Sequence, residues 1–367
     1  MKLQKGWLPN ISKTIWMVLD DDFLPVKPIE EYLHYLDNLE RSPNTIVSYA
    51  RNLKMYWEFL QENHYDWKEI KTRELADFIH WLRNPNPKVI SLKPQQASRC
   101  EKTINHAITT VIGFYEFHSN MGTVRTLNAY KNTSFPNNRK YKSLLYHISQ
   151  DKPIKSKLLK LKEPKTFPRC LTKNEVTLLI NGCNCKRDKF IICLLYETGM
   201  RIGEVLGLRH EDIDSTGINE INVVKRDLNL NGARAKSGRR TIHVSKELMQ
   251  LYGDYLIEEY PEEIESDYVF VNCYKKPIGI PIKKSNIDGL FRRLAKKTGI
   301  KASPHLFRHT HATELIRAGW DMMHIQKRLG HASVQTTINT YVHLNNSDLK
   351  EEYQKYLEHQ QKDDITK

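Results

Sequence analysis

Apolar side chains recur every three or four residues through the first third of the chain, which is the period of an amphipathic helix. One such pattern covers residues 29–39, and a second follows Ser42-Pro43, where a hydroxyl and a proline suit a helix start. A third helix is predicted after Thr72, and a longer fourth one begins near Pro94. Four such helices predict a small bundle.

The apolar pattern changes its period in the second half of the chain. Thr172 and Glu175 form a capping box before a helix, and a buried helix is predicted over residues 190–196. Gly199 permits a sharp turn, after which Arg201 opens another helix. The later predicted elements are strands at 218–225, 240–244 and 268–271, a hairpin turn at 233–239, and helices at 246–259 and 287–297. The predicted fold class is therefore mainly α with a small antiparallel β-sheet.

Changes in pattern also set the expected domain boundaries. Residues 1–26 predict a short structured arm that contains the apolar stretch from Trp16 to Leu19. A segment rich in lysine and arginine but poor in apolar pattern separates two folded parts. The expected boundaries are 1–26 for the N-terminal arm, 27–136 for a helical domain, 137–168 for a basic interdomain linker, 169–345 for a second domain and 346–367 for a C-terminal tail helix.

The charge of the chain narrows the choice of partner. Its 367 residues carry a net charge of +14, which favours a polyanion such as nucleic acid or an acidic membrane surface. No apolar run approaches the ~20 residues that span a bilayer, and Lys2 and Lys5 precede no signal-peptide pattern. We therefore expect a cytoplasmic protein whose partner is nucleic acid and not a membrane. The residues expected to contact DNA are Arg51, Lys54, Arg99 and Lys102 in the helical domain and Lys155 and Lys157 in the linker.

Cysteine and histidine spacing gives no metal-binding pattern. The six cysteines are few for this length, which fits reduced thiols. Cys183-x-Cys185 lacks a second ligand pair at zinc spacing, and His305, His309 and His311 form no His-Glu-x-x-His motif. We expect neither a metal site nor a cofactor.

Residues 303–341 gather imidazole, guanidinium and phenol groups at the ends of short apolar segments, with few carboxylates between them. Such a set suits a phosphate group. Metal-free cleavage of a DNA phosphodiester needs an in-line nucleophile, cations at the two non-bridging oxygens and a proton donor for the leaving 5′ oxygen. Tyrosine can serve as the nucleophile beside cations, and paired arginines suit the oxygens through their bidentate forks.

One ordered series of motifs runs through the second half of the chain. In sequence it is Gly199-Met200-Arg201-x-x-Glu204, Lys236, His305-x-x-Arg308-His309, Leu329-Gly330-His331 and Tyr341-x-His343. This series resembles the tyrosine recombinase (phage integrase) family, and within it the integrases and transposases of mobile elements. The helical domain, with Ser42-Pro43-Asn44-Thr45 at a helix start, resembles the SAM-like core-binding domain of that family. The resemblance implies a catalytic domain with the DNA breaking-rejoining fold.

The resemblance also implies the roles of individual residues, and a reaction that needs neither ATP nor metal because the phosphotyrosyl link conserves the bond energy. The implied roles are Tyr341 as nucleophile, Arg201 and Arg308 at the non-bridging oxygens, His331 as hydrogen-bond donor to the phosphate, His305 as assistant in proton transfer at the tyrosine, Lys236 as acid for the 5′ oxygen and Glu204 as support for Arg201. The alternatives to Lys236 are Lys225, Arg234, Arg239 and Arg240, and those to Tyr341 are Tyr353 and Tyr356.

The expected partner is a double-stranded DNA recombination site. The resemblance implies a homo-tetramer on two such sites, coupled through the C-terminal tail, which carries apolar residues on one side between Ser347 and His359. An accessory protein could set the direction of the reaction. Two alternatives share parts of this expectation: a type IB topoisomerase-like enzyme that relaxes DNA, and a catalytically silent DNA-binding regulator.

Overall fold

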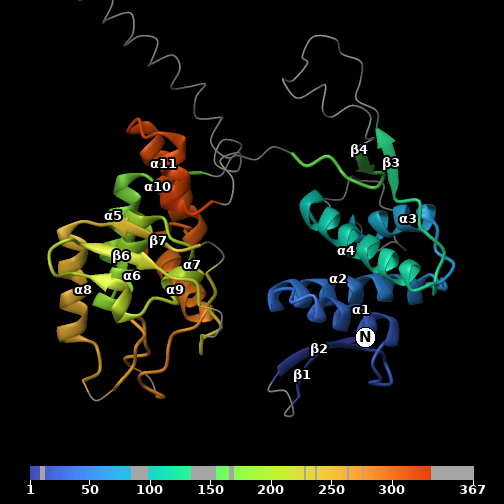
Figure 1. Cartoon of the computed structure of the whole chain (residues 1–367), viewed down its shortest axis with the longest axis horizontal. Helices are drawn as coiled ribbons and strands as arrows, with labels where there is room; N and C mark the ends of the chain where they lie inside the picture. Colours follow the sequence, from blue (N-terminus) through green and yellow to red (C-terminus); the bar gives the residue numbers. More distant parts are fainter. Residues whose placement is uncertain are drawn as a thin grey trace, which may run out of the picture. The chain divides into compact units, whose positions relative to one another are not determined.

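The structure is a computed structural model that divides into two compact units, Met1–Lys165 and Thr166–Lys367. Figure 1 shows the elements of both units. The described residues are 1–8, 13–83, 98–133, 154–164, 169–226, 229–235, 238–262, 264–274 and 276–331. The predicted fold class is confirmed, since helices dominate and the strands form small antiparallel sheets.

The N-terminal unit is a bundle of helices, as the apolar periodicity predicts. Its helices are α1 (Lys27–Asn38), α2 (Pro43–Glu62), α3 (Thr72–Arg83) and α4 (Glu101–Asn120). Ser42 caps α2 by accepting a hydrogen bond from the backbone N–H of Thr45 at 3.3 Å. Buried aromatic side chains fill the centre, where the Tyr56 and Tyr115 hydroxyls lie 2.7 Å apart.

The start of α4 differs from its prediction near Pro94. The helix begins at Glu101, seven residues later. Ser98 and Arg99 donate instead to main-chain carbonyls at the end of α3, at 3.0 Å each. These bonds hold the residues before Glu101 in a turn, because they satisfy the last carbonyls of the preceding helix.

The N-terminal arm folds as a β-hairpin, which the sequence pattern does not predict. Strand β1 (Lys2–Leu8) pairs antiparallel with β2 (Lys13–Leu19). Val18 is buried against the helical core, so the base of the hairpin belongs to the same unit. A second pair, β3 (Tyr130–Thr133) with β4 (Ile154–Lys157), joins the end of the helical region to part of the expected linker.

The second unit packs a small sheet against a group of helices. Its helices are α5 (Lys173–Gly182), α6 (Lys186–Thr198), α7 (Ile202–Val205), the 3-10 helix η2 (His210–Asp212), α8 (Lys246–Glu258), α9 (Lys284–Thr298), α10 (Pro304–Arg317) and α11 (Met322–Leu329). The predicted capping box of Thr172 and Glu175 is present at α5. Helix α6 packs against α5, α8 and α10 (Figure 1), which makes it the centre of this unit.

The sheet is antiparallel in the order β5 (Ile213–Asp214), β6 (Glu220–Val223), β7 (Arg240–His243). The strand predicted at 268–271 is not a strand of this sheet. Its ends make two isolated bridges instead, Tyr268 to Arg209 and Val271 to Pro281. The segment is apolar because Val269 and Phe270 fill the core, and burial alone gives no sheet pairing.

No helix among the described residues has the length and apolar character needed to cross a membrane.

Burial raises the pKa of the Cys183 thiol to about 12, which disfavours the thiolate form that binds metal ions. Within the described ranges, no group of three histidine, cysteine, aspartate or glutamate side chains is arranged to hold a metal ion.

Candidate active site

The candidate site is built around the C-terminal end of α11, where backbone carbonyls have no partner within the helix. The successive carbonyls of residues 328–330 accept hydrogen bonds from Arg240, Arg308 and Arg201, at 2.8, 2.7 and 3.1 Å respectively. Gly330 ends the helix in the left-handed conformation, with φ of 66°. Three guanidinium groups that are distant in sequence therefore meet at one helix end.

A buried carboxylate ties two of these arginines together. Glu204 lies one turn after Arg201, and its side chain is fully buried. One of its oxygens accepts from the guanidinium groups of Arg201 and Arg240, both at 3.2 Å. The other accepts from the Arg201 backbone N–H at 2.9 Å and from Arg240 at 2.7 Å. This arrangement holds the Arg201 side chain in place, which is the contact expected of Glu204 as a support for Arg201.

Two glycines let the surrounding segments approach closely. At Gly199, where φ is 60°, an added Cβ would lie 2.8 Å from the His311 ring. The Gly199 carbonyl also accepts from Arg308 at 2.9 Å. At Gly203, an added Cβ would lie 2.5 Å from the backbone oxygen of Arg234. Side chains at these positions would push α10 and the β6–β7 connection away from Arg201.

His331 follows Gly330 and faces the same charges. Burial lowers its pKa to about 4, with further lowering by Arg308, Arg201 and Arg240 and a small opposing effect from Glu204. The imidazole is therefore neutral near pH 7 and can donate one hydrogen bond without adding charge.

The other predicted catalytic residues are only partly described. His305 lies on the first turn of α10, with an exposed side chain, one turn before the buried Arg308. Ser303 caps this helix by accepting from the backbone N–H of Leu306 at 3.3 Å. Lys236 and Tyr341 lie outside the described residues. The structure thus brings together Arg201, Glu204, Arg308 and His331 from the predicted set.

Sequence reasoning did not assign the contacts of Arg240 and Arg328. Arg240 occupies the same face of β7 as the buried Ile242, and an arginine on the inward face of a strand is the signal that could have found it. Arg328 donates to the imidazole of His311 at 3.1 Å and to the carbonyls of Glu197 and His243. Arg328 thereby fastens α11 to α6, β7 and α10.

The basic residues expected to contact DNA differ in their surroundings. Lys54 pairs with Glu58 at 2.6 Å, and Arg99 donates to the carbonyl of Leu82 at 3.0 Å. Both therefore already contact groups of their own unit. Arg51 and Lys102 are exposed. The side chains of Lys155 and Lys157 lie outside the described part of the structure.

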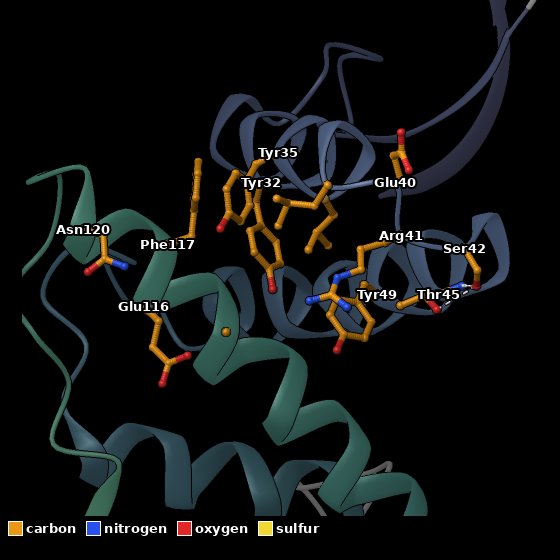
Figure 2. A pocket seen from close by; sticks show the side chains of 13 residues that line it. Tyr32, Tyr35, Glu40, Arg41, Ser42, Thr45, Tyr49, Glu116, Phe117 and Asn120 are labelled. Atoms are coloured by element: carbon orange, nitrogen blue, oxygen red, sulfur yellow. Dashed lines mark hydrogen bonds between the residues drawn. The ribbon is translucent and has the colours of Figure 1, made fainter. Parts of the chain in front are cut away.

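The N-terminal unit also has an open cleft of about 580 Å³ between α1, the start of α2 and α4 (Figure 2). Tyr32, Tyr35 and Phe117 gather on one side of it, and Arg41 lies beside Tyr49 on the other. Of the residues expected to contact DNA, the four whose side chains the structure describes (Arg51, Lys54, Arg99 and Lys102) do not line this cleft.

Sequence models of two related domains match the chain. The model of the phage integrase family covers residues 169–348, and that of the N-terminal SAM-like domain of phage integrases covers residues 29–120. The chain belongs to the phage integrase family of tyrosine recombinases. Transposase A of transposon Tn554 from Staphylococcus aureus is 44% identical over 360 residues, which are 98% of each chain. Tyrosine recombinase XerC of Staphylococcus carnosus is 24% identical over 89% of this chain and 95% of its own.

Solved structures of recombinases share the fold. The integrase of transposon Tn1549 in complex with transposon right end DNA has a TM-score of 0.61 at 19% identity, over 90% of this chain and 98% of that one. XerH recombinase bound to a palindromic difH substrate has a TM-score of 0.57 at 18% identity, over 89% and 83%. At such identities the likeness concerns the fold.

Proposed function

We propose that this protein is a site-specific DNA recombinase that cuts and rejoins DNA strands through a 3′-phosphotyrosyl intermediate, and so integrates, excises or transposes a mobile element. One observation carries the proposal. Two guanidinium groups, Arg201 and Arg308, reach the same carbonyl of Leu329 at 3.4 and 2.7 Å, beside a neutral His331. Permanent cations next to an uncharged donor suit the non-bridging oxygens of a phosphodiester.

In the proposed reaction the Tyr341 oxygen attacks the scissile phosphorus and the bond to the 5′ oxygen breaks. Arg201 and Arg308 stabilise the charge that builds on the two non-bridging oxygens, and His331 donates a hydrogen bond to one of them. The new bond between tyrosine and the 3′ phosphate replaces the one that was broken. A second strand's 5′ hydroxyl can therefore reverse the step without ATP or a metal ion.

Protons must move at both ends of this step. His305 takes the proton of the tyrosine hydroxyl, and Lys236 donates one to the leaving 5′ oxygen. Arginine keeps its proton under all physiological conditions, so Arg234, Arg239 and Arg240 are poorer proton donors than Lys236. Arg240 is also engaged with Glu204 and the end of α11.

The proposed substrate is a pair of double-stranded DNA sites. The names of the transposon relatives and the net charge of +14 support DNA ends of a mobile element as the partner. We infer a homo-tetramer on two sites, coupled through the tail after residue 346, and an accessory protein that sets direction. The reaction would take place in the cytoplasm, with the element's DNA.

The test uses the DNA that flanks the coding sequence. Nicked duplexes tiled across the flanking junctions are mixed with the full chain, because a nick releases the 5′ segment and traps the covalent step. The expected result is a protein–DNA adduct that survives denaturation, and its absence with Tyr341→Phe. Adduct formation by Tyr341→Phe, or no adduct with any flanking duplex, would contradict the proposal.

A further inference from the structure

From an almost buried position on β7, Arg240 makes three hydrogen bonds to other described residues of the site. Its Nε donates to the Arg328 carbonyl at 2.8 Å, and its two terminal nitrogens donate to separate oxygens of Glu204 at 3.2 and 2.7 Å. The side chain is only 9% exposed. A planar guanidinium matches both oxygens of one carboxylate while its Nε donates to a third acceptor, whereas the three diverging donors of an ammonium group do not fit this planar arrangement.

Glu204 makes this arginine necessary. Its buried carboxylate holds Arg201, but a buried negative charge beside a phosphate site would oppose the binding of an anion. The second ion pair, with Arg240 at 2.7 Å, offsets that charge. The three arginines Arg201, Arg240 and Arg308 together with Glu204 then carry a net charge of about +2, since His331 is neutral. The scissile phosphate carries one negative charge and gains a second as the nucleophile adds.

We propose that Arg240 is a positioning residue of strand cleavage: it neutralises Glu204 and holds the end of α11, so that Arg201 stays directed at the phosphate without Arg240 touching DNA. The inference rests on the proposed function. Arg240 also begins β7, four residues after Lys236, so it fixes the strand end of the connection that carries the proposed acid.

The experiment is a double-substitution cycle in single-turnover cleavage of the nicked duplex. Arg240→Gln is expected to slow cleavage by about 100-fold, close to the loss of one transition-state donor, with DNA affinity changed by less than about threefold. Adding Glu204→Gln removes the carboxylate that has lost its partner, so the double variant should recover about tenfold. A double variant that is as slow as Arg240→Gln, or slower, would mean that Arg240 is only a structural support, and would overturn the proposal.

A second readout needs no DNA. The charged groups facing His331 are Arg308 from α10, Arg201 and Glu204 at α7, and Arg240 from β7. In Arg240→Gln the smallest of the three arginine effects that disfavour imidazolium is gone, so the pKa of His331 should rise above about 4, while burial, Arg308 and Arg201 still lower it. Nuclear magnetic resonance of the ring protons measures this in the full chain. An unchanged His331 pKa would overturn the proposal.

Two further variants separate the role from general stability. Arg240→Lys keeps the charge, and should leave the His331 pKa near 4 while slowing cleavage through the lost fork. Arg226→Gln breaks a matched, partly buried ion pair, in which Arg226 binds both oxygens of the buried Asp212 at 2.7 and 2.8 Å. It should cost stability but leave cleavage and the titration of His331 unchanged.

The outcomes also distinguish this inference from the proposed function. If Arg240→Gln cleaves within about threefold of the wild-type rate, the proposed role of Arg240 is overturned and the recombinase proposal stands. Failure of the wild type on every flanking duplex removes the recombinase proposal, and the titration of His331 then decides whether Arg240 acts on the charges around His331. Equal slowing by Arg226→Gln would overturn the specific role of Arg240.

Discussion

Arg308 is both a proposed phosphate ligand and a structural residue. Its guanidinium is buried and donates to the carbonyls of Gly199 and Leu329 at 2.9 and 2.7 Å. Arg308→Lys should slow cleavage at least about 100-fold and destabilise the second unit by roughly 1–3 kcal/mol, since one buried carbonyl loses its donor. Arg317→Lys, on the exposed end of the same helix, is the control. Cleavage by Arg308→Lys at the wild-type rate would exclude Arg308 as a ligand of the non-bridging oxygens.

His311 makes stability depend on pH. Burial and the neighbouring Arg328 lower its pKa to about 3, whereas a histidine in the unfolded chain titrates near 6.5. Between these values the unfolded chain binds more protons, so stability falls as pH falls below about 6.5, by at most about 1.4 kcal/mol per pH unit. His311→Gln should make the free energy of unfolding less dependent on pH in this range, by up to about 1.4 kcal/mol per pH unit. Urea unfolding at pH 4.5–7.5, followed through α10 amide resonances, measures it; parallel curves for both proteins would contradict the assignment.

At the residue scale, the sequence singles out some of the residues that meet at the end of α11 and not others, for a physical reason. Arg308 and His331 stand in motifs whose spacing carries their chemistry, and both meet Arg201 in the structure. The contacts of Arg240 and His311 depend on partners that are distant in sequence, and no local pattern specifies such a contact. The one local indication is that Arg240 lies two residues before the buried Ile242 on β7, and residues two apart on a strand point to the same face.

At the element scale, the end of α11 is the feature on which the arginine cluster depends. Gly330→Ala would place a side chain at φ of 66°, at a cost of roughly 1 kcal/mol, and would shift the carbonyls that accept from the arginines. Gly299→Ala imposes the same backbone penalty at the end of α9, where φ is 75° and nothing lies within 4 Å of the added Cβ. Both variants should melt lower, but only Gly330→Ala should slow cleavage. Equal cleavage rates for Gly330→Ala and Gly299→Ala would show that the end of α11 does not affect the reaction.

Elements with strong local signals agree with the sequence pattern. The capping box before α5, the proline and hydroxyl before α2 and the left-handed Gly199 after α6 are all specified within a few residues. The β1–β2 hairpin and the late start of α4 were missed because pairing and packing decide them. β1 contains Lys2, Gln4 and Lys5 and does not alternate cleanly, so its strand character comes from β2.

For the whole molecule, the net charge of +14 predicts DNA binding that weakens steeply with salt. Each phosphate contact adds about 0.9 to the slope of log affinity against log salt concentration. Arg51→Ala should reduce that slope by about one, since Arg51 is exposed on α2. Lys54→Ala should change it less, because Lys54 is paired with Glu58 at 2.6 Å. Fluorescence anisotropy from 50 to 200 mM salt measures both, and equal slopes for Arg51→Ala and wild type would remove Arg51 from the interface.

In the proposed reaction, one tyrosine becomes covalently joined to DNA. The most direct measurement is tandem mass spectrometry of the trapped adduct after digestion with protease and nuclease, which locates the residual nucleotide on a single peptide. In the wild type we expect a 3′-phosphonucleotide on Tyr341. A nucleotide on Tyr353, on Tyr356 or on any residue other than Tyr341 would contradict it.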